Sequence, residues 1–166
     1  MTAHADVRTA AEGTEVAYTE PGPIQMRVLF LGQVETGARE WTARIDYTGG
    51  SPEGTICFFL SNPGQFGNMF GRHAAAGQTS VIRVVAWPVA GGIRVASLRK
   101  TADGQLFSGS EEIASADGKF NLGLSATTKV TFRQFRYRRL PADWSPEKDP
   151  MLRNSNFSKD ATHGTR

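Results

Sequence analysis

A chain of 166 residues with a net charge of +3 has the size of one domain and can bury a real core. Its eighteen glycines, eight prolines and ten phenylalanines are typical of many short strands joined by turns. The single cysteine, Cys57, excludes an intrachain disulfide, and no apolar run approaches the roughly 18 residues of a membrane span. Residues 129–166 carry nine Lys or Arg against four Asp or Glu, so the positive charge lies at the C-terminal end.

Residues 1–15 are small and polar, and predict a flexible arm without fixed structure. This stretch has no apolar core of the kind found in secretory signals, so we expect no export signal there. Period-two alternation and short apolar runs then predict strands up to residue 124. These are expected over residues 16–18, 24–30, 41–47, 55–60, 81–87, 93–98 and 120–124.

A loop or single helical turn is expected over 66–77, and a hairpin turn over 102–105. The last strand, 129–140, has a change of parity. Val130 and Phe132 share one face, whereas Phe135 and Tyr137 share the other. This change requires an extra residue near Arg133–Gln134, so we predict a bulge there with the aromatic residues inward.

About eight strands and no sustained helical periodicity predict an all-β fold, a two-sheet antiparallel, jelly-roll-like β-sandwich. We assign residues 1–15 to the arm, 16–140 to the sandwich and 141–166 to a proline-containing, extended, non-helical tail. Trp144 and Phe157 are spaced along this tail as apolar anchors. Two interpretations stay open, a tail that docks along a neighbouring surface and a disordered terminus.

No catalytic constellation is found, so we predict a non-enzymatic protein without catalytic, metal or cofactor residues. His4 and His163 lie in the terminal segments, and His73 is expected in a solvated loop. The adjacent Glu111 and Glu112 would point to opposite faces of a strand, so they cannot act together as an acid and base pair.

The basic strand is the strongest surface feature, because its arginines interleave with aromatic residues. This composition is common on nucleic-acid surfaces, but alternation turns most of the aromatic residues inward. A solvated or inter-subunit face is therefore favoured over RNA binding. The interaction candidates are Arg133, Arg136, Arg138, Arg139, Trp144 and Phe157.

Residues 24–145 resemble the jelly-roll coat proteins of small, picorna-like RNA viruses in their strand rhythm. The resemblance rests on Trp41, the run Gly54–Leu60, the strand Lys129–Arg139 and the proline-rich tail. It implies a shell subunit, or capsid protein, whose arms contact copies of itself or related subunits. It also implies a location in the virion or the host cytoplasm, and RNA could contact the basic strand.

Residues 41–140 also resemble the concanavalin-like sandwich, which includes laminin-G-type domains. Gly123-Leu124 and Val130–Arg136 look like its closing strand, and Asp103–Leu106 looks like its "DGQL" hairpin. This second resemblance implies carbohydrate binding, with a glycan as the partner. It requires an exposed aromatic residue, Trp87 or Phe66, beside carboxylates in a groove. We take a structural assembly subunit as the main hypothesis, and a carbohydrate-binding sandwich as the alternative.

Overall fold

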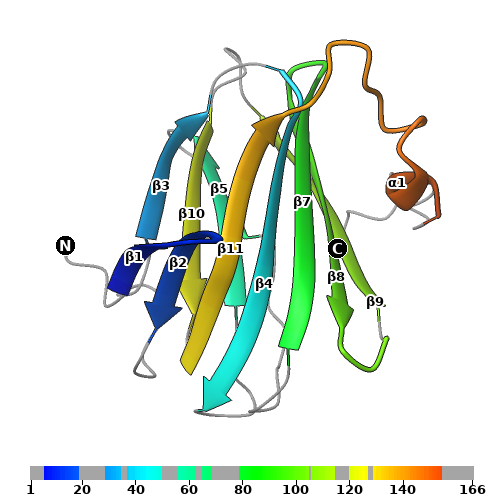
Figure 1. The fold of residues 1–166 in the computed structure, drawn as a ribbon. Helices are drawn as coiled ribbons and strands as arrows, with labels where there is room; N and C mark the ends of the chain where they lie inside the picture. Colours follow the sequence, from blue (N-terminus) through cyan, green and yellow to red (C-terminus); the bar gives the residue numbers. More distant parts are fainter. Residues whose placement is uncertain are drawn as a thin grey trace, which may run out of the picture.

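The computed structural model describes residues 6–18, 29–34, 37–49, 56–62, 65–68, 79–104, 106–114, 120–126 and 129–154. Within them, two antiparallel sheets form two layers (Figure 1). The larger sheet contains β1 (Asp6–Ala10), β2 (Gly13–Tyr18), β4 (Arg39–Gly49), β7 (Thr79–Val89), β8 (Gly92–Thr101), β9 (Leu106–Ala114) and β11 (Lys129–Arg139). The smaller sheet contains β3 (Leu29–Val34), β5 (Ile56–Asn62), β6 (Gln65–Asn68) and β10 (Phe120–Ala126).

In each sheet some strands pair with their neighbours in the sequence and others pair with distant segments. The seven-stranded sheet runs β1-β2-β11-β4-β7-β8-β9, and the four-stranded sheet runs β3-β10-β5-β6. The β7–β8 hairpin closes through Ala90 and Gly91, where Gly91 has a φ of 78° that a residue with a Cβ rarely adopts. In contrast, β11 reaches across the chain to lie between β2 and β4. The predicted two-sheet antiparallel β-sandwich is confirmed.

The core lies on the face of the seven-stranded sheet that the second layer covers. In β4, Trp41, Ala43, Ile45 and Tyr47 are at most 4% exposed, whereas the intervening Arg44 is exposed. Strict alternation therefore separates an inner, apolar face from an outer, charged face. The same inner cluster includes Val16, Tyr18, Ile82, Val84, Ala86, Ile93, Val95, Val130 and Phe132.

The bulge predicted in the last strand is confirmed in β11. Arg133 pairs with Arg44, but the next paired residue, Arg136, lies opposite Thr42, so β11 has one extra residue. Gln134 takes a φ of 53° at this point. As a result Phe132 and Tyr137 lie opposite the inward residues Ile45 and Trp41, despite their different parity.

Three expectations about the ends and edges of the sandwich are wrong. Residues 6–10 form the edge strand β1 because their backbone pairs with β2, so the fixed structure begins before residue 16. Pro150–Asn154 forms a helix, α1, in a tail predicted to be non-helical. The loop prediction for 66–77 is wrong for residues 66–68, which pair with β5. The rest of that loop, and residues 24–28 of the expected strand 24–30, lie outside the described residues.

The described strands number eleven, three more than the eight expected. The sequence analysis did not predict β9, because Gly109 and Glu111 interrupt the apolar alternation between Phe107 and Ile113. An edge strand covered on one side only needs little apolar alternation, so the pattern is weak there.

Candidate functional site

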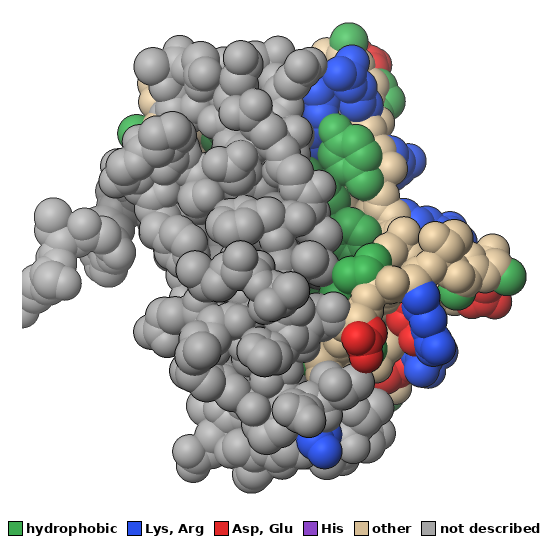
Figure 2. All heavy atoms as spheres, turned by 90° about the vertical axis from the view of Figure 1, so that its left-hand side faces the viewer, with side chains coloured by type: hydrophobic (Ala, Val, Ile, Leu, Met, Phe, Trp, Pro, Cys, Tyr) green, Lys and Arg blue, Asp and Glu red, His purple; other side chains and the backbone are tan. Residues whose placement is uncertain are grey.

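The outer face of the seven-stranded sheet carries side chains of both charges (Figure 2). Near β1 and β2, Glu15 accepts from Arg8 and, at 2.7 Å, from Arg133. Arg133 also donates to Asp46 at 2.7 Å, and Asp46 accepts from Arg44 at 2.9 Å. These contacts form an ion-pair network that crosses β1, β2, β11 and β4.

The carboxylate of Asp46 is held in its charged form by this network. Partial burial raises its pKa, but hydrogen bonds from Arg44, Thr79 and Arg133 outweigh that effect and lower the pKa below 3.8. The charge of Arg133 is therefore balanced by two acids, which leaves it poorly placed to attract a further anion.

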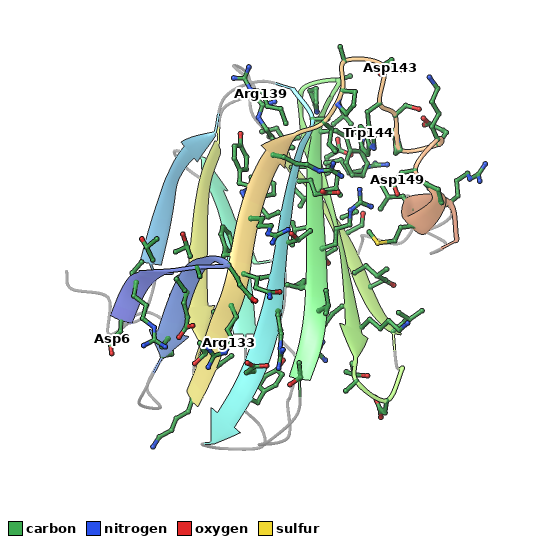
Figure 3. The ribbon with its side chains drawn as sticks, in the orientation of Figure 1. Asp6, Arg133, Arg139, Asp143, Trp144 and Asp149 are labelled. Atoms are coloured by element: carbon green, nitrogen blue, oxygen red, sulfur yellow. The ribbon has the colours of Figure 1, made fainter. Side chains whose placement is uncertain are left out.

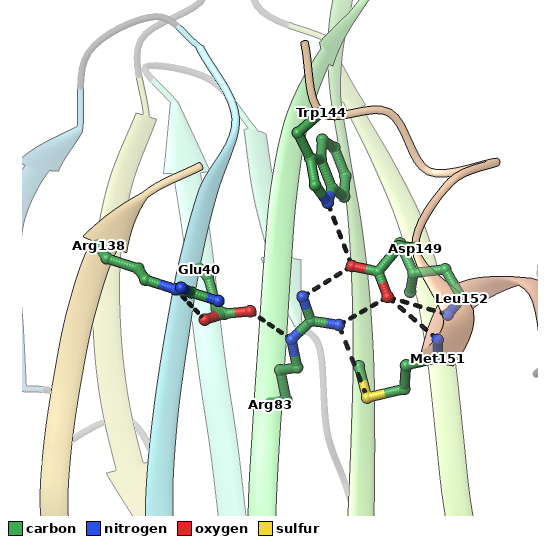
Figure 4. Close-up of polar contacts among 7 residues, drawn as sticks. All are labelled: Glu40, Arg83, Arg138, Trp144, Asp149, Met151 and Leu152. Carbon is green, nitrogen blue, oxygen red and sulfur yellow. Dashed lines mark hydrogen bonds and ion pairs between the residues drawn. The ribbon is translucent and has the colours of Figure 1, made fainter. Parts of the chain in front are cut away.

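A second ion-pair network lies further along the same face and ties the C-terminal segment to the sheet (Figure 4). Glu40 on β4 accepts from Arg83 on β7 and from Arg138 on β11. Arg83 also donates to both oxygens of Asp149, at 2.9 and 2.7 Å. We call residues 141–154, which contain Asp149, the strap.

Asp149 is the centre of the contacts that hold the strap. Besides Arg83, its oxygens accept from the indole nitrogen of Trp144 at 3.1 Å and the backbone nitrogen of Met151 at 3.1 Å. Burial raises its pKa, but these hydrogen bonds, with Arg83 first among them, lower it to about 2. A carboxylate with this many donors at 6% exposure fixes the geometry of the segment around it.

The strap folds back over the outer face of β7 and β8. It leaves the sheet after Leu140, passes through three hydrogen-bonded turns and enters α1 (Figure 3). Trp144 meets Trp87 on β7 edge to face, with ring centroids 5.8 Å apart. Val85 on β7 and Ala96 on β8 pair with each other on the outer face, and both have no exposed surface.

A cavity of about 500 Å³ lies between the sheet and the strap. The sheet contributes Trp87, Val89 and Arg94. The strap contributes Glu147, Leu152 and Arg153. An aromatic ring, two guanidinium groups and a carboxylate thus share one concave site, which is the arrangement expected of a small-molecule site.

The charges around this cavity are not all balanced. Arg94 donates to Glu112 on β9 at 2.7 Å. The pKa of Glu147 is lowered by hydrogen bonds from its own backbone and from Ser145, so it is a carboxylate at neutral pH. For Arg153, we find no acidic partner within the described part of the chain.

The predicted interaction residues separate into distinct environments. Arg133 and Arg138 belong to the two ion-pair networks. Arg136 is exposed opposite Thr42, and Arg139 lies exposed at the end of β11 (Figure 3). These arginines do not form one continuous basic surface, since carboxylates lie between them.

The predicted tail anchors lie differently. Trp144 packs on the protein's own sheet, and Phe157 lies outside the described residues. Of the two aromatic residues suggested for a sugar site, Trp87 lines the cavity. The side chain of Phe66 lies outside the described part of the structure.

Sequence reasoning did not identify Arg83, Arg94, Asp149 or Arg153. The pair Asp149-Pro150 carried a usable signal, because an acidic cap before a proline is typical of a helix start. The partners of these side chains lie on other strands, so their meeting is a property of the sheet register. Within the described ranges no acidic or histidine cluster could hold a metal ion, and no helix could span a membrane.

Comparison with known proteins identifies the fold. No protein family and no curated protein matches the sequence. A solved structure of peanut lectin with a nine-residue peptide has a TM-score of 0.55 and 8% identity, and the match covers 82% of this chain and 90% of the lectin. A Saccharomyces cerevisiae protein of unknown function has a TM-score of 0.51 and 11% identity over 82% and 92% of the two chains.

A seed lectin of Lotus tetragonolobus is also similar, with a TM-score of 0.48, 10% identity and coverage of 82% and 92%. The similarity matches the second of the two resemblances, and at such identities it concerns the fold. The protein has a two-sheet antiparallel β-sandwich fold similar to that of peanut lectin.

Proposed function

We propose that the protein is a non-enzymatic, carbohydrate-binding β-sandwich whose ligand occupies the cavity between β7–β8 and the strap. The observation that carries this proposal is the position of Trp87 in a cavity of about 500 Å³ beside Glu147 and Arg94. A pyranose ring needs an apolar surface for its C–H groups and fixed hydrogen-bond groups for its hydroxyls. The cavity provides both.

The lectins similar in fold support this choice of ligand, since a lectin is by definition a sugar-binding protein. Among the described residues one carboxylate, Glu147, lines the cavity, whereas most glycoside hydrolases use two. Binding without hydrolysis is therefore the better proposal.

The shell-subunit hypothesis has less support. It requires terminal segments that contact other chains, whereas β1 pairs with β2 and the strap packs on β7 and β8 of the same chain. RNA binding through β11 is also less favoured, because Arg133 and Arg138 already contact acidic side chains. A phosphate would have to displace those carboxylates.

A glycan array followed by calorimetric titration of the best glycan tests the proposal. The comparison uses the intact protein, Trp87→Ala and Trp87→Phe. We expect Trp87→Ala to weaken binding by about tenfold or more, and Trp87→Phe to retain most of it, because stacking depends on the ring. A matched control is Lys100→Ala, an exposed side chain six residue pairs from Trp87, about 20 Å along the sheet.

Trp87 also contacts Trp144, so each variant is first tested for an intact strap by limited proteolysis. No glycan bound by the intact protein, or equal binding by the intact protein and Trp87→Ala, would refute the proposal.

A further inference from the structure

The cavity has a charge pattern that goes beyond what a neutral sugar requires. Arg94 and Arg153 both line it, but they differ in their partners. Glu112 neutralises Arg94 at 2.7 Å, whereas no described acid pairs with Arg153. Asp149, the acid nearest to Arg153 along the sequence of the strap, is already held by Arg83.

Glu147 does not remove this imbalance. It lines the same cavity, but no ion pair joins it to Arg153. It is fully exposed, so solvent screens its charge, and hydrogen bonds from its own backbone and from Ser145 hold its carboxylate. The guanidinium of Arg153 therefore remains available on the strap side of the cavity, to which the sheet contributes Trp87.

We infer that the ligand is an anionic saccharide, whose ring lies against Trp87 and whose acidic group is bound by Arg153. This inference rests on the proposed function and adds the ligand class to it. A guanidinium binds a planar carboxylate through two parallel N–H groups, which gives both charge and orientation. Glu147 then accepts hydrogen bonds from ring hydroxyls on the same side.

The acidic group could be the carboxylate of a uronic acid or a sulfate ester, because both present oxygens to a guanidinium in the same way. The experiment separates these sources with three probes of similar length. They are an oligogalacturonate, a sulfated galactan oligosaccharide and a neutral galactan oligosaccharide. Each is titrated into the intact protein, Arg153→Gln, Arg153→Lys and the control Lys100→Ala.

We expect the intact protein to bind one acidic probe at least about tenfold more tightly than the neutral one. Arg153→Gln should abolish that preference by weakening the binding of the acidic probe about tenfold or more, and Arg153→Lys should restore part of it. Lys100→Ala removes a positive charge from the same sheet and should retain the preference. Raising the salt from about 50 to 300 mM should weaken acidic binding alone.

Two other outcomes separate this inference from the function on which it rests. Binding of neutral and acidic probes with equal affinity, lost in Trp87→Ala, would overturn the inference and leave carbohydrate binding intact. The inference also fails if Arg153→Gln keeps the full acidic preference. If none of the probes and no glycan of the array binds, both the proposed function and the inference fail.

Discussion

Replacing Asp149 with asparagine tests whether the strap is held by charge. The substitution keeps the size of the side chain but turns one acceptor oxygen into a donor group. Asp149 accepts from Arg83 through both oxygens, at 2.9 and 2.7 Å. In Asp149→Asn the side-chain NH₂ group replaces one of these oxygens and faces an N–H group of Arg83. Two donors then oppose each other, so both the ion pair and one hydrogen bond are lost.

The size of the effect follows from the pKa of Asp149, which is about 2 in the folded protein against an ordinary 3.8. Each pH unit of difference corresponds to about 1.4 kcal/mol, so the charged form contributes about 2.5 kcal/mol to the free energy of unfolding at neutral pH. Because the folded pKa is the lower one, this contribution is complete well above pH 3.8. It is lost as the pH falls toward 2.

The assay is urea denaturation at pH 7, 4 and 2, followed by tryptophan fluorescence. At pH 7 we expect Asp149→Asn to lower the midpoint by about 1 M, from a slope of about 2 kcal/mol per molar urea. Near pH 2 the intact protein and the variant should converge. The matched control is Asp143→Asn, the same change at an exposed position of the strap, which should leave the midpoint unchanged.

The reasoning is refuted if Asp149→Asn behaves like Asp143→Asn at pH 7. It is also refuted if the deficit of Asp149→Asn is as large at pH 2 as at pH 7. If the strap detaches before the sandwich unfolds, proteolysis within the strap at pH 7 reports the same free energy.

Three further predictions concern the core, the bulge and the strap. Phe132→Ala should lower the free energy of unfolding by about 3–5 kcal/mol in urea, since Phe132 is fully buried, and a loss below about 1 kcal/mol would contradict its place in the core. Gln134→Val should cost about 1–2 kcal/mol and Gln134→Gly almost nothing, because φ is 53° there; equal urea midpoints for the two variants would contradict a left-handed residue in solution. Trp144→Ala should speed proteolysis of the strap by about tenfold or more while the core stays folded, because it removes the contact with Trp87 and a donor to Asp149. An unchanged cleavage rate would show that the strap is held without Trp144.

The fold could be predicted where the sequence imposes a local constraint. The parity change between Phe132 and Phe135 required an extra residue, and the structure has it at Gln134. Alternation along residues 41–47 likewise separated the inner from the outer face of β4. These features depend on residues within one strand, so a pattern of period two is sufficient to find them.

The edges were harder to predict because their residues owe their structure to a neighbour. All five residues of β1 are exposed, and the strand exists through its backbone pairing with β2. The sequence DVRTA contains no alternation that would distinguish it from a flexible arm. Local propensity is a weak guide wherever a strand is stabilised mainly by pairing.

The candidate site was the hardest part of the structure to predict from the sequence. The alternation along a strand indicates which residues point outward, but not which residues of different strands contact each other. Arg83 and Asp149 are 66 residues apart, and Arg138 and Glu40 are 98 residues apart. These two contacts depend on β11, β4 and β7 being neighbours and on the strap returning across them. Reading β11 alone, as a run of arginines, suggested a basic surface. The register instead places a carboxylate beside Arg138 and another beside Arg133. The unbalanced charge lies at Arg153, in a tail where the sequence singled out Trp144 but not this arginine.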